Sequence, residues 1–511
     1  MIRRIPLSRF AWFLAAVLAV FTAACSVPLA PGYRVAKESR EVRFVPGDAP
    51  EVRVHARFTL VNSGTGDLQF LDVNLPNEKD YGRADLHAEL DGQPATLAPL
   101  PEEYQSESPN ALRLAFDPPW KQGKTIQVAL DYAFRAPADS GTRISLGADT
   151  FHLGSRGWFP ELLPPKHFMS PAPVRPDKSE YAVRVPSGYS VLARGALVSR
   201  KKEGGETIFR YRLRMGDLSP FVVAGRYTAS GEERKTIAIF WTMGPAKQDT
   251  SAVEAQIADA WNTLLADFGP LDADKKSGTR VPHIVEAPGL RSHVARGPGP
   301  AAAAFPGGVL VNPEALDLGL NSPEFLEMVT HALAHNWFGD QMYPDEYAGV
   351  GLSEGLPEYA TIVVEESREG AEGRRARIVR YLNEYDAAVR LGTEKPLAVT
   401  LLTDPPEVRR IGLAKAPLFF AALEDECGET AMHRGLARMV ALLRGREVGY
   451  DDLRSALEEA SGKKLGEIFR SWLNQKGIPQ DFRERYQGKP TGADAPPHRQ
   501  RFPAASASGL N

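Results

Sequence analysis

Cysteine is almost absent from this sequence, with only Cys25 and Cys427 among 511 residues. If Cys25 is used at the N-terminus, no disulfide can form within the mature chain. Cys427 lies in an apolar helical context, where a lone cysteine is typical of a small core residue and not of a nucleophile. The fold is therefore expected to form without disulfides.

A large excess of charge of one sign is also missing. The chain has 61 Lys and Arg against 64 Asp and Glu, a net charge of −3. This balance gives no reason to expect nucleic acid as a partner. Apolar residues make up 43% and charged residues 24% of the chain, which is typical of a folded protein with a filled core. The length is sufficient for about two to four domains.

Long hydrophobic runs are missing except at one place. Only residues 10–24 form such a run, and three arginines precede it, Arg3, Arg4 and Arg9. A positive segment before a short apolar segment is typical of a signal peptide, and this run is too short to span a membrane comfortably. We therefore expect residues 1–24 to be a signal peptide.

The residues around Cys25 resemble a bacterial lipobox. Ala23 and Ala24 come directly before Cys25, although Thr22 stands where leucine is usual. In that interpretation Cys25 is lipidated, and Ser26 favours the outer membrane facing the periplasm. The alternative is ordinary cleavage after Ala24, which would release the protein from the membrane. The favoured prediction is an exported envelope lipoprotein that contacts the membrane through its N-terminal lipid.

The chain then separates into regions of different periodicity. Residues 25–50 are expected to be the lipidated cysteine and an extended tether. Residues 51–235 contain several segments in which apolar and polar residues alternate, and this pattern predicts a mostly antiparallel β domain. Helical periodicity dominates residues 236–484. Residues 485–511 are polar and rich in Pro, Ala and Ser, and we expect a disordered tail there. The predicted fold class is α+β with several domains.

The helical region contains a candidate metal site. His331 and His335 are four residues apart and therefore share one face of a helix that begins near Asn321. With Glu354 they form a set of two imidazoles and one carboxylate, which is the ligand set of a zinc site with one open position. A pair of histidines alone is weak, since it also fits a helix with two surface histidines. Ala332 stands beside His331, where a general base would lie.

The surrounding motifs resemble the aminopeptidase N family of zinc metallopeptidases, the gluzincins. His335 is followed by Asn-Trp-Phe-Gly, and Glu354 lies in the segment Ser-Glu-Gly-Leu-Pro-Glu-Tyr after an interval of 18 residues. The resemblance implies a shortened bacterial member with a degenerate active site. It implies an N-terminal β saddle domain followed by a thermolysin-like, mainly helical domain. It also implies one zinc ion, held by His331, His335 and Glu354, with Glu358 as a supporting acid. The alternative is a relic site that keeps its shape by packing alone.

The sequence departs from the family pattern at three functional positions. Ala332 occupies the place of the family's general-base glutamate. No acidic residue occurs between Glu286 and Glu314, where the family has an acid that anchors the substrate's amine. Leu413 occupies the place of the family's oxyanion-stabilising tyrosine. Glu327, one turn before His331, is a weak candidate for a substitute base.

These departures lead to three hypotheses. The first is a pseudopeptidase that keeps the fold and the zinc ligands and binds a peptide or protein in its cleft. The second is an active zinc metallopeptidase with a substituted general base. The third is a structural lipoprotein without metal.

Overall fold

The structure is a computed structural model of the whole chain. It describes 32–76, 82–105, 110–135, 144–154, 157–165, 174, 176–213, 220–231, 238–243, 250–271, 281–290, 300–345 and 348–488. The signal peptide, Cys25 and the tail expected from the sequence lie outside these residues, apart from 485–488. The described residues pack into two compact units. One contains residues of 32–42, 53–134 and 159–180, and the other contains residues of 43–52, 135–158 and 181–488.

The first unit is built from β-strands. Five neighbouring strands follow the order β1-β2-β8-β4-β5, and four others form a sheet in the order β11-β3-β7-β6. The bounds are Arg34–Val45 (β1), Glu51–Val61 (β2), Leu68–Asn74 (β3), Ala84–Leu90 (β4), Gln93–Ala95 (β5), Leu97–Pro99 (β6), Ala111–Trp120 (β7), Thr125–Phe134 (β8) and Glu161–Leu163 (β11). One short helix, α3 (Glu102–Gln105), accompanies them.

Strand β2 illustrates why this region forms sheets. Its alternate residues from Val52 to Leu60 are buried, and the polar residues between them are more exposed. Period-two burial is the pattern of a strand that packs on one face. Strand β1 shows the same alternation, with Val42 and Phe44 buried. This strand lies inside the range that was expected to be a tether, so part of that range is folded into the sheet.

The second unit contains further strands and most of the helices. Strands β14, β15 and β12 are successive neighbours, and β13-β16-β10-β9 form a small sheet. A five-stranded sheet has the order β17-β18-β19-β21-β20, and β22 pairs with β23. The bounds are Ile144–Leu146 (β9), Thr150–Leu153 (β10), Ser179–Pro186 (β12), Ser190–Ala193 (β13), Ala196–Glu203 (β14), Glu206–Leu213 (β15), Val222–Gly225 (β16), Tyr227–Ala229 (β17), Ile239–Met243 (β18), His283–Glu286 (β19), Ala302–Phe305 (β20), Gly308–Val311 (β21), Tyr343–Pro344 (β22) and Glu447–Val448 (β23).

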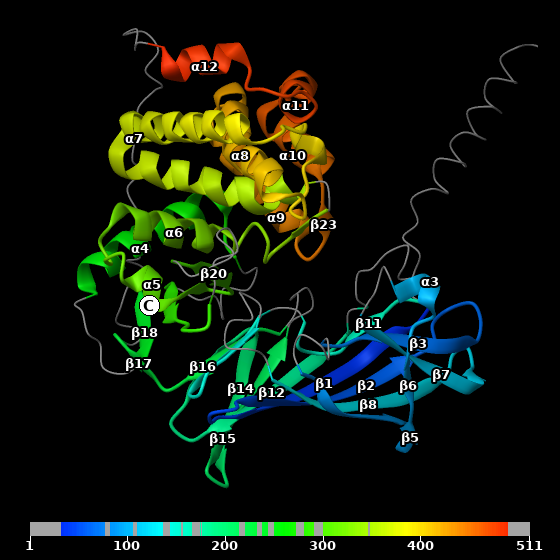
Figure 1. Ribbon diagram of the computed structural model, residues 1–511. Coiled ribbons are helices and arrows are strands. Elements are labelled where there is room, and N and C mark those ends of the chain that lie inside the picture. Colours follow the sequence, from blue (N-terminus) through cyan, green and yellow to red (C-terminus); the bar gives the residue numbers. More distant parts are fainter. Residues whose placement is uncertain are drawn as a thin grey trace, which may run out of the picture. The chain divides into compact units, whose positions relative to one another are not determined.

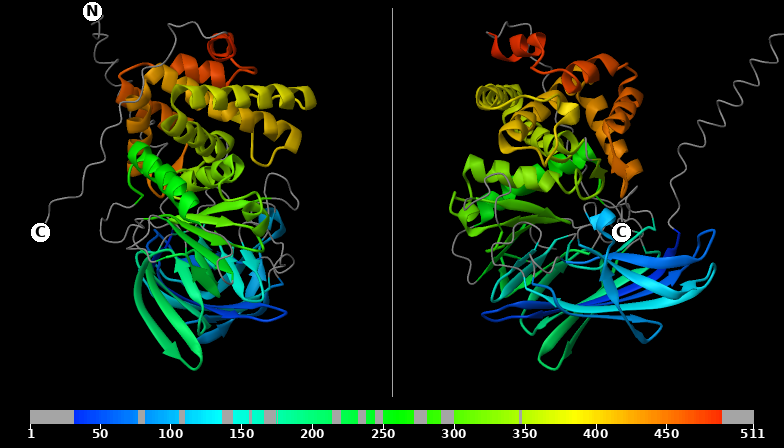
Figure 2. Two further views of the ribbon diagram at one scale, coloured as in Figure 1. Left: turned by 90° about the vertical axis from the view of Figure 1, so that its left-hand side faces the viewer. Right: turned by 45° about the vertical axis from the view of Figure 1, so that its right-hand side comes forward.

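The helices of the second unit surround one large apolar core (Figure 1). They are Ser251–Phe268 (α4), Pro313–Leu316 (α5), Pro323–Ala334 (α6), Gly349–Gly355 (η1, a π-helix), Leu356–Leu391 (α7), Leu397–Val399 (η2, a 3₁₀-helix), Pro406–Cys427 (α8), Glu429–Leu443 (α9), Tyr450–Ser461 (α10), Gly466–Leu473 (α11) and Gln480–Gln487 (α12). Figure 2 shows the helices from α7 onward gathered together. Among the described residues, no helix combines the length and the apolar character needed to cross a bilayer.

Helix α7 consists of two segments that turn back on each other at Gly370. The backbone there has φ 72° and ψ −160°, a conformation that glycine adopts without the strain a side chain would add. Figure 1 shows the two segments side by side. As a result, residues of the second segment lie against residues near the start of the first.

The predicted fold class is confirmed: a β region with several sheets precedes a mainly helical region. The N-cap of α6 is Ser322, whose hydroxyl accepts a hydrogen bond from the Phe325 amide. The alanine-rich segment between Glu286 and Glu314 contains strand β20. The domain boundaries expected from the sequence stay a prediction.

Candidate metal centre

Helix α6 positions both histidines. Pro323 occupies its first turn, where a missing amide donor does no harm, and the Ser322 cap fixes its start. His331 lies in the last turn and His335 at the C-cap. One helical turn separates them, so their rings project to the same side.

Glu354 comes from the π-helix η1, which packs too closely for a side chain at Gly351 or Gly355. A Cβ atom on Gly351 would lie 2.1 Å from the Tyr450 hydroxyl, and one on Gly355 would lie 2.5 Å from the Ala416 Cβ. Single turns of π-helix are often found at functional sites. Here the close packing holds Glu354 toward α6.

The three side chains converge. Nε2 of His331 lies 3.0 Å from Nε2 of His335. Oε2 of Glu354 lies 3.6 Å from Nε2 of His331 and 3.8 Å from Nε2 of His335. Bonds of about 2.0–2.1 Å in a tetrahedral site would place ligand atoms roughly 3.3 Å apart. The spacing therefore suits a small divalent cation with these three residues as ligands.

The other nitrogen of each ring also has a partner. Nδ1 of His331 lies 3.1 Å from Oε1 of Glu358, and Nδ1 of His335 lies 3.1 Å from the Phe338 carbonyl oxygen. The Phe338 carbonyl can only accept, so Nδ1 of His335 carries a proton, and the nearby Glu358 carboxylate favours a proton on Nδ1 of His331 although the two atoms are not aligned for a hydrogen bond. Both Nε2 atoms are then acceptors in the neutral rings, and two acceptors at 3.0 Å require a shared cation or proton. This arrangement fits a metal ion, because metal-binding histidines ordinarily donate their second N–H to such partners.

The charges around the rings agree with this need for a cation. Burial lowers the pKa of His331, but the Glu358 and Glu354 carboxylates outweigh burial and raise it to about 10. Burial lowers the pKa of His335, and a charged His331 lowers it further. The carboxylates therefore stabilise one positive charge in the cluster. The same carboxylates would stabilise a zinc ion, which carries two positive charges in place of one.

Tyr381 extends the contacts of Glu358. Its hydroxyl donates to Oε2 of Glu358 and lies 3.1 Å from the Thr361 hydroxyl. Burial raises the pKa of Glu358, but charged His331 and the Tyr381 hydrogen bond outweigh burial and lower it to about 2. The carboxylate is thus held ionised, facing His331.

Ala332 and Glu327 occupy α6 near the histidines. Ala332 is buried in the apolar core and carries only a methyl group. Glu327 forms ion pairs with Arg377 and Arg380, and the Arg380 Nη1 to Glu327 Oε2 distance is 2.6 Å. Burial would raise the pKa of Glu327, but the two arginines outweigh burial and hold it below its usual value. This carboxylate is therefore bound to arginines, which disfavours it as a substitute base.

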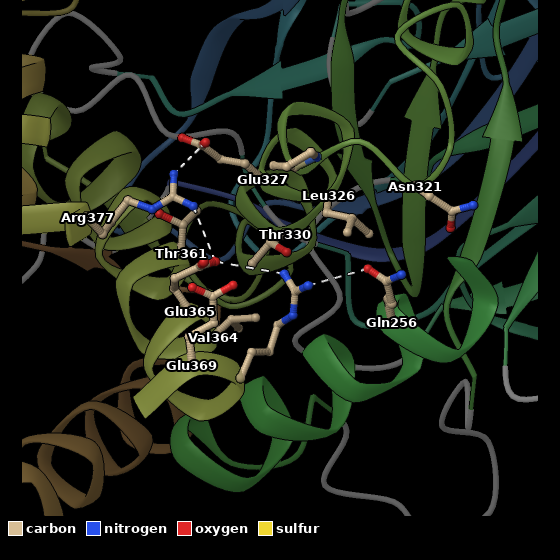
Figure 3. A pocket seen from close by; sticks show the side chains of 12 residues that line it. Gln256, Asn321, Leu326, Glu327, Thr330, Thr361, Val364, Glu365, Glu369 and Arg377 are labelled. Carbon is tan, nitrogen blue, oxygen red and sulfur yellow. Dashed lines mark hydrogen bonds and ion pairs between the residues drawn. The ribbon is translucent and has the colours of Figure 1, made fainter. Parts of the chain in front are cut away.

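Figure 3 shows the ion pair between Glu327 and Arg377. Both residues line a pocket of about 210 Å³ between α4, α6 and α7. Arg377 reaches Glu327 on one side and Glu365, at 3.4 Å, on the other. The charged groups of this pocket therefore largely neutralise one another.

Two other regions named by the sequence lie in this unit. Leu413 is on α8, partly buried against the apolar core. Two residues later, the buried Lys415 contacts Glu394 at 3.4 Å and donates to the Gln475 carbonyl at 2.6 Å. The alanine-rich segment forms β20, the last strand of its sheet among the described residues.

The sequence did not single out two residues that contact the cluster's surroundings. Tyr381 is one, since only the bend of α7 brings it to Glu358. Asn336 is the other: its side chain accepts from the Gly307 amide at 2.8 Å and donates to the Gly308 carbonyl at 3.3 Å. In the sequence, only its position directly after His335 pointed to a role for Asn336 near the metal site.

Comparisons with known proteins agree with this geometry. Residues 307–472 match the peptidase family M1 domain. The chain is 27% identical over 162 residues to an aminopeptidase N from Lactobacillus delbrueckii subsp. lactis, covering 30% of this chain and 19% of that protein. It is 21% identical over 313 residues to a probable aminopeptidase 1 from Sulfurisphaera tokodaii, covering 58% of this chain and 38% of that protein. The chain thus spans well under half the length of these curated relatives.

Solved structures share the fold over a longer range. An M1 zinc metallopeptidase from Deinococcus radiodurans, a Glu-to-Ala variant bound to a Tyr-Ser-Ala substrate, gives a TM-score of 0.60 at 19% identity. The match covers 88% of this chain and 95% of that one. Aminopeptidase A from Legionella pneumophila gives 0.62 at 16% identity, over 89% of this chain and 50% of that one. The resemblance noted in the sequence is confirmed for this region: residues 307–472 form a peptidase family M1 domain, and the chain is similar to aminopeptidases of that family.

Proposed function

We propose that this protein is a zinc-binding pseudopeptidase, a lipid-anchored envelope protein that binds a peptide or protein partner in its metal-site cleft. The observation that carries the proposal is a contrast within one site. His331, His335 and Glu354 converge with metal-ligand spacing. The residue beside His331 is nevertheless a buried alanine.

The three ligands would hold the zinc, and Glu358 and Phe338 would orient the two rings. A bound zinc supplies Lewis-acid polarisation of water or of a carbonyl oxygen. The chain's own residues would have to move the proton. The Ala332 methyl group cannot accept one, and loss of a positioned base typically reduces a rate about 10²- to 10⁴-fold.

The neighbouring carboxylates already bind other side chains. Glu358 faces His331 and Tyr381, Glu327 faces two arginines, and Asp340 forms an ion pair with the buried Arg194. Moving any of them to the cluster would leave a charged partner poorly compensated, which is unfavourable in a buried setting. These contacts disfavour a substitute base and therefore disfavour hydrolysis.

The other two departures from the family pattern, the missing acid and the missing tyrosine, also disfavour hydrolysis. Strand β20 offers alanines where the family has an amine-anchoring acid, and Leu413 has no hydroxyl to stabilise an oxyanion. A preorganised oxyanion donor contributes about 10²- to 10³-fold in rate. Together the three departures leave the metal ligands in place with few groups that could carry out hydrolysis.

Peptide binding itself is supported by a structural neighbour. The Deinococcus radiodurans protein described above holds a Tyr-Ser-Ala substrate as a Glu-to-Ala variant. An alanine-substituted protein of this fold can therefore retain a peptide. We extend this behaviour to the present chain as part of the proposal.

The envelope location is the second part of the proposal. It is supported by the apolar run before Cys25 and by the lipobox-like residues around it. Metabolic labelling with a fatty acid should mark the wild-type protein, and a Cys25→Ala variant should be unlabelled and released from the membrane fraction. Equal labelling of both proteins would contradict a lipid on Cys25.

The binding role is tested by titrating fluorescent peptides into the zinc-loaded protein and into the chelator-treated protein. We expect saturable binding that weakens when zinc is removed, without cleavage of the peptide. Rapid zinc-dependent cleavage would instead support the alternative, an active metallopeptidase with a substituted base.

A further inference from the structure

A β-hairpin of the second unit has an exposed outer edge. Strands β14 and β15 form the hairpin (Figure 1), and Gly204 and Gly205 make its two-residue turn with φ angles of 56° and 81°. Positive φ at both turn positions matches the twist of the paired strands, so the hairpin has a defined shape. Among the described residues β14 is the last strand of its sheet, and each of its residues after Ala196 is exposed.

This hairpin is basic, although the whole chain has a net charge of −3. Its basic residues are Arg200, Lys201, Lys202, Arg210 and Arg212. Its acidic residues, Glu203 and Glu206, both contact cations. Glu203 lies 2.9 Å from Lys201, and Glu206 lies 2.8 Å from Arg43 and 3.3 Å from Arg184. Positive charge is therefore in excess along the exposed edge.

Two large apolar side chains lie beside these charges. Leu197 is 54% exposed and Val198 is 52% exposed. Val198 is the extra residue of a β-bulge, at the position where the pairing register shifts. Leu197, Arg200 and Lys202 pair with alternate residues of β15 and therefore share one face of the hairpin. Basic side chains protect an edge strand from pairing with another chain, whereas exposed leucine and valine favour a contact.

A bilayer with anionic phospholipids suits both kinds of side chain. Each lysine or arginine close to anionic headgroups strengthens binding by about fivefold. Apolar side chains next to such cations can enter the boundary between the headgroups and the acyl chains. A second copy of this chain is a poor partner, because pairing two β14 edges would bring like charges together.

The proposed lipid on Cys25 would keep the folded chain near a bilayer. Strand β1 begins at Arg34, nine positions after Cys25. An extended segment of this length spans about 30 Å at most. Such a tether keeps the local concentration of the bilayer high, so a contact that is weak by itself would still be occupied.

From these observations, we infer that the β14–β15 hairpin is a membrane-contact surface for anionic phospholipids. Arg200 and Lys202 bind the headgroups, and Leu197 and Val198 insert between them. This inference rests on the envelope location in the proposed function, and it adds the face of the second unit that turns toward the bilayer.

The test measures binding of the Cys25→Ala protein to vesicles of phosphatidylethanolamine, with and without phosphatidylglycerol. The protein is extracted at high salt, which screens surface charges, and sedimented with vesicles at low salt. We expect binding at least about tenfold stronger to the vesicles that contain phosphatidylglycerol. Equal or undetectable binding to both would overturn the inference. The result does not depend on whether wild-type Cys25 is lipidated, so the lipid anchor and the peptide-binding role stand or fall by their own tests.

A charge-reversal pair locates the contact. Arg200→Glu with Lys202→Glu should weaken binding to the anionic vesicles by at least about tenfold. The matched control is Arg390→Glu with Lys476→Glu, which changes the net charge equally at exposed positions outside the hairpin. This control should bind as the parent protein does, and circular dichroism should show that both variants are folded. Equal weakening in the two pairs would overturn the hairpin as the contact.

Soluble polyglutamate separates a bilayer from an acidic protein as the partner. Leu197→Ser with Val198→Ser should weaken vesicle binding by about fivefold or more, because the inserted side chains are lost, and leave polyglutamate binding unchanged. Vesicle binding that the two serines do not alter would overturn the insertion. Binding to polyglutamate without binding to anionic vesicles would assign the surface to an acidic protein and overturn the inference.

Discussion

Oε1 of Glu358 lies 3.1 Å from Nδ1 of His331, and this contact fixes the ring that presents Nε2 to the cluster. The carboxylate is itself held by the Tyr381 hydroxyl from the returning segment of α7. Metal affinity should therefore depend on residues that never touch the metal.

Replacing Glu358 with glutamine should weaken zinc binding about 10- to 100-fold, because His331 loses an ionised acceptor. Tyr381→Phe should weaken it less, since the carboxylate remains. Competition with a chromophoric chelator measures both affinities. Tyr385→Phe is the control, because Tyr385 is a buried tyrosine one turn further along α7. Affinities equal to that of the wild type in both test variants would show that Glu358 does not orient His331.

Replacing Glu327 with glutamine should reduce stability and leave peptide hydrolysis undetectable. The variant removes the partner of Arg377 and Arg380, and we expect a loss of about 1–3 kcal/mol in the free energy of unfolding. Chemical denaturation and a peptide hydrolysis assay on the same preparation check both expectations. Asp386→Asn, which breaks the ion pair between α7 and Arg483, is the comparison. Wild-type hydrolysis that disappears in Glu327→Gln would favour the active-enzyme alternative.

Replacing Gly351 with alanine should disturb the π-helix that carries Glu354. The added Cβ would meet the Tyr450 hydroxyl at 2.1 Å, and overpacking of this kind costs about 1–3 kcal/mol. Zinc affinity should fall together with stability. Tyr450→Phe removes the nearest atom, so the double variant should recover part of both losses. Additive losses would indicate that the two residues do not interact.

His152 should make the protein sensitive to acid. It is buried with no hydrogen-bond partner for Nδ1, and burial lowers its pKa from 6.5 to about 3. A histidine whose pKa is lower in the folded state protonates more readily when unfolded, so its contribution is full above pH 6.5 and falls as the pH drops toward 3. Relative to wild type, His152→Phe should gain about 2 kcal/mol between pH 7 and pH 5. A difference in unfolding free energy that does not change with pH would contradict this.

Periodicity and spacing predicted much of this architecture. Alternation found strands such as β2, and helical spacing placed His331 and His335 on one face. The sequence could not reveal β20, because consecutive alanines have no alternation, and only pairing with β21 makes them a strand. It could not place Tyr381 either, because the geometry of the bend at Gly370 decides which residues of α7 face Glu358. The sequence could not predict the ion pairs of Glu327 either, because Arg377 and Arg380 lie on the segment of α7 that follows this bend.

The central claim is that the protein keeps its zinc frame and has given up hydrolysis. The most direct test measures metal content and peptide hydrolysis on one purified sample of the protein. We predict about one zinc ion per chain and no turnover above the metal-free background. Zinc-dependent turnover by the unaltered protein, or a protein that cannot be loaded with zinc, would contradict the claim.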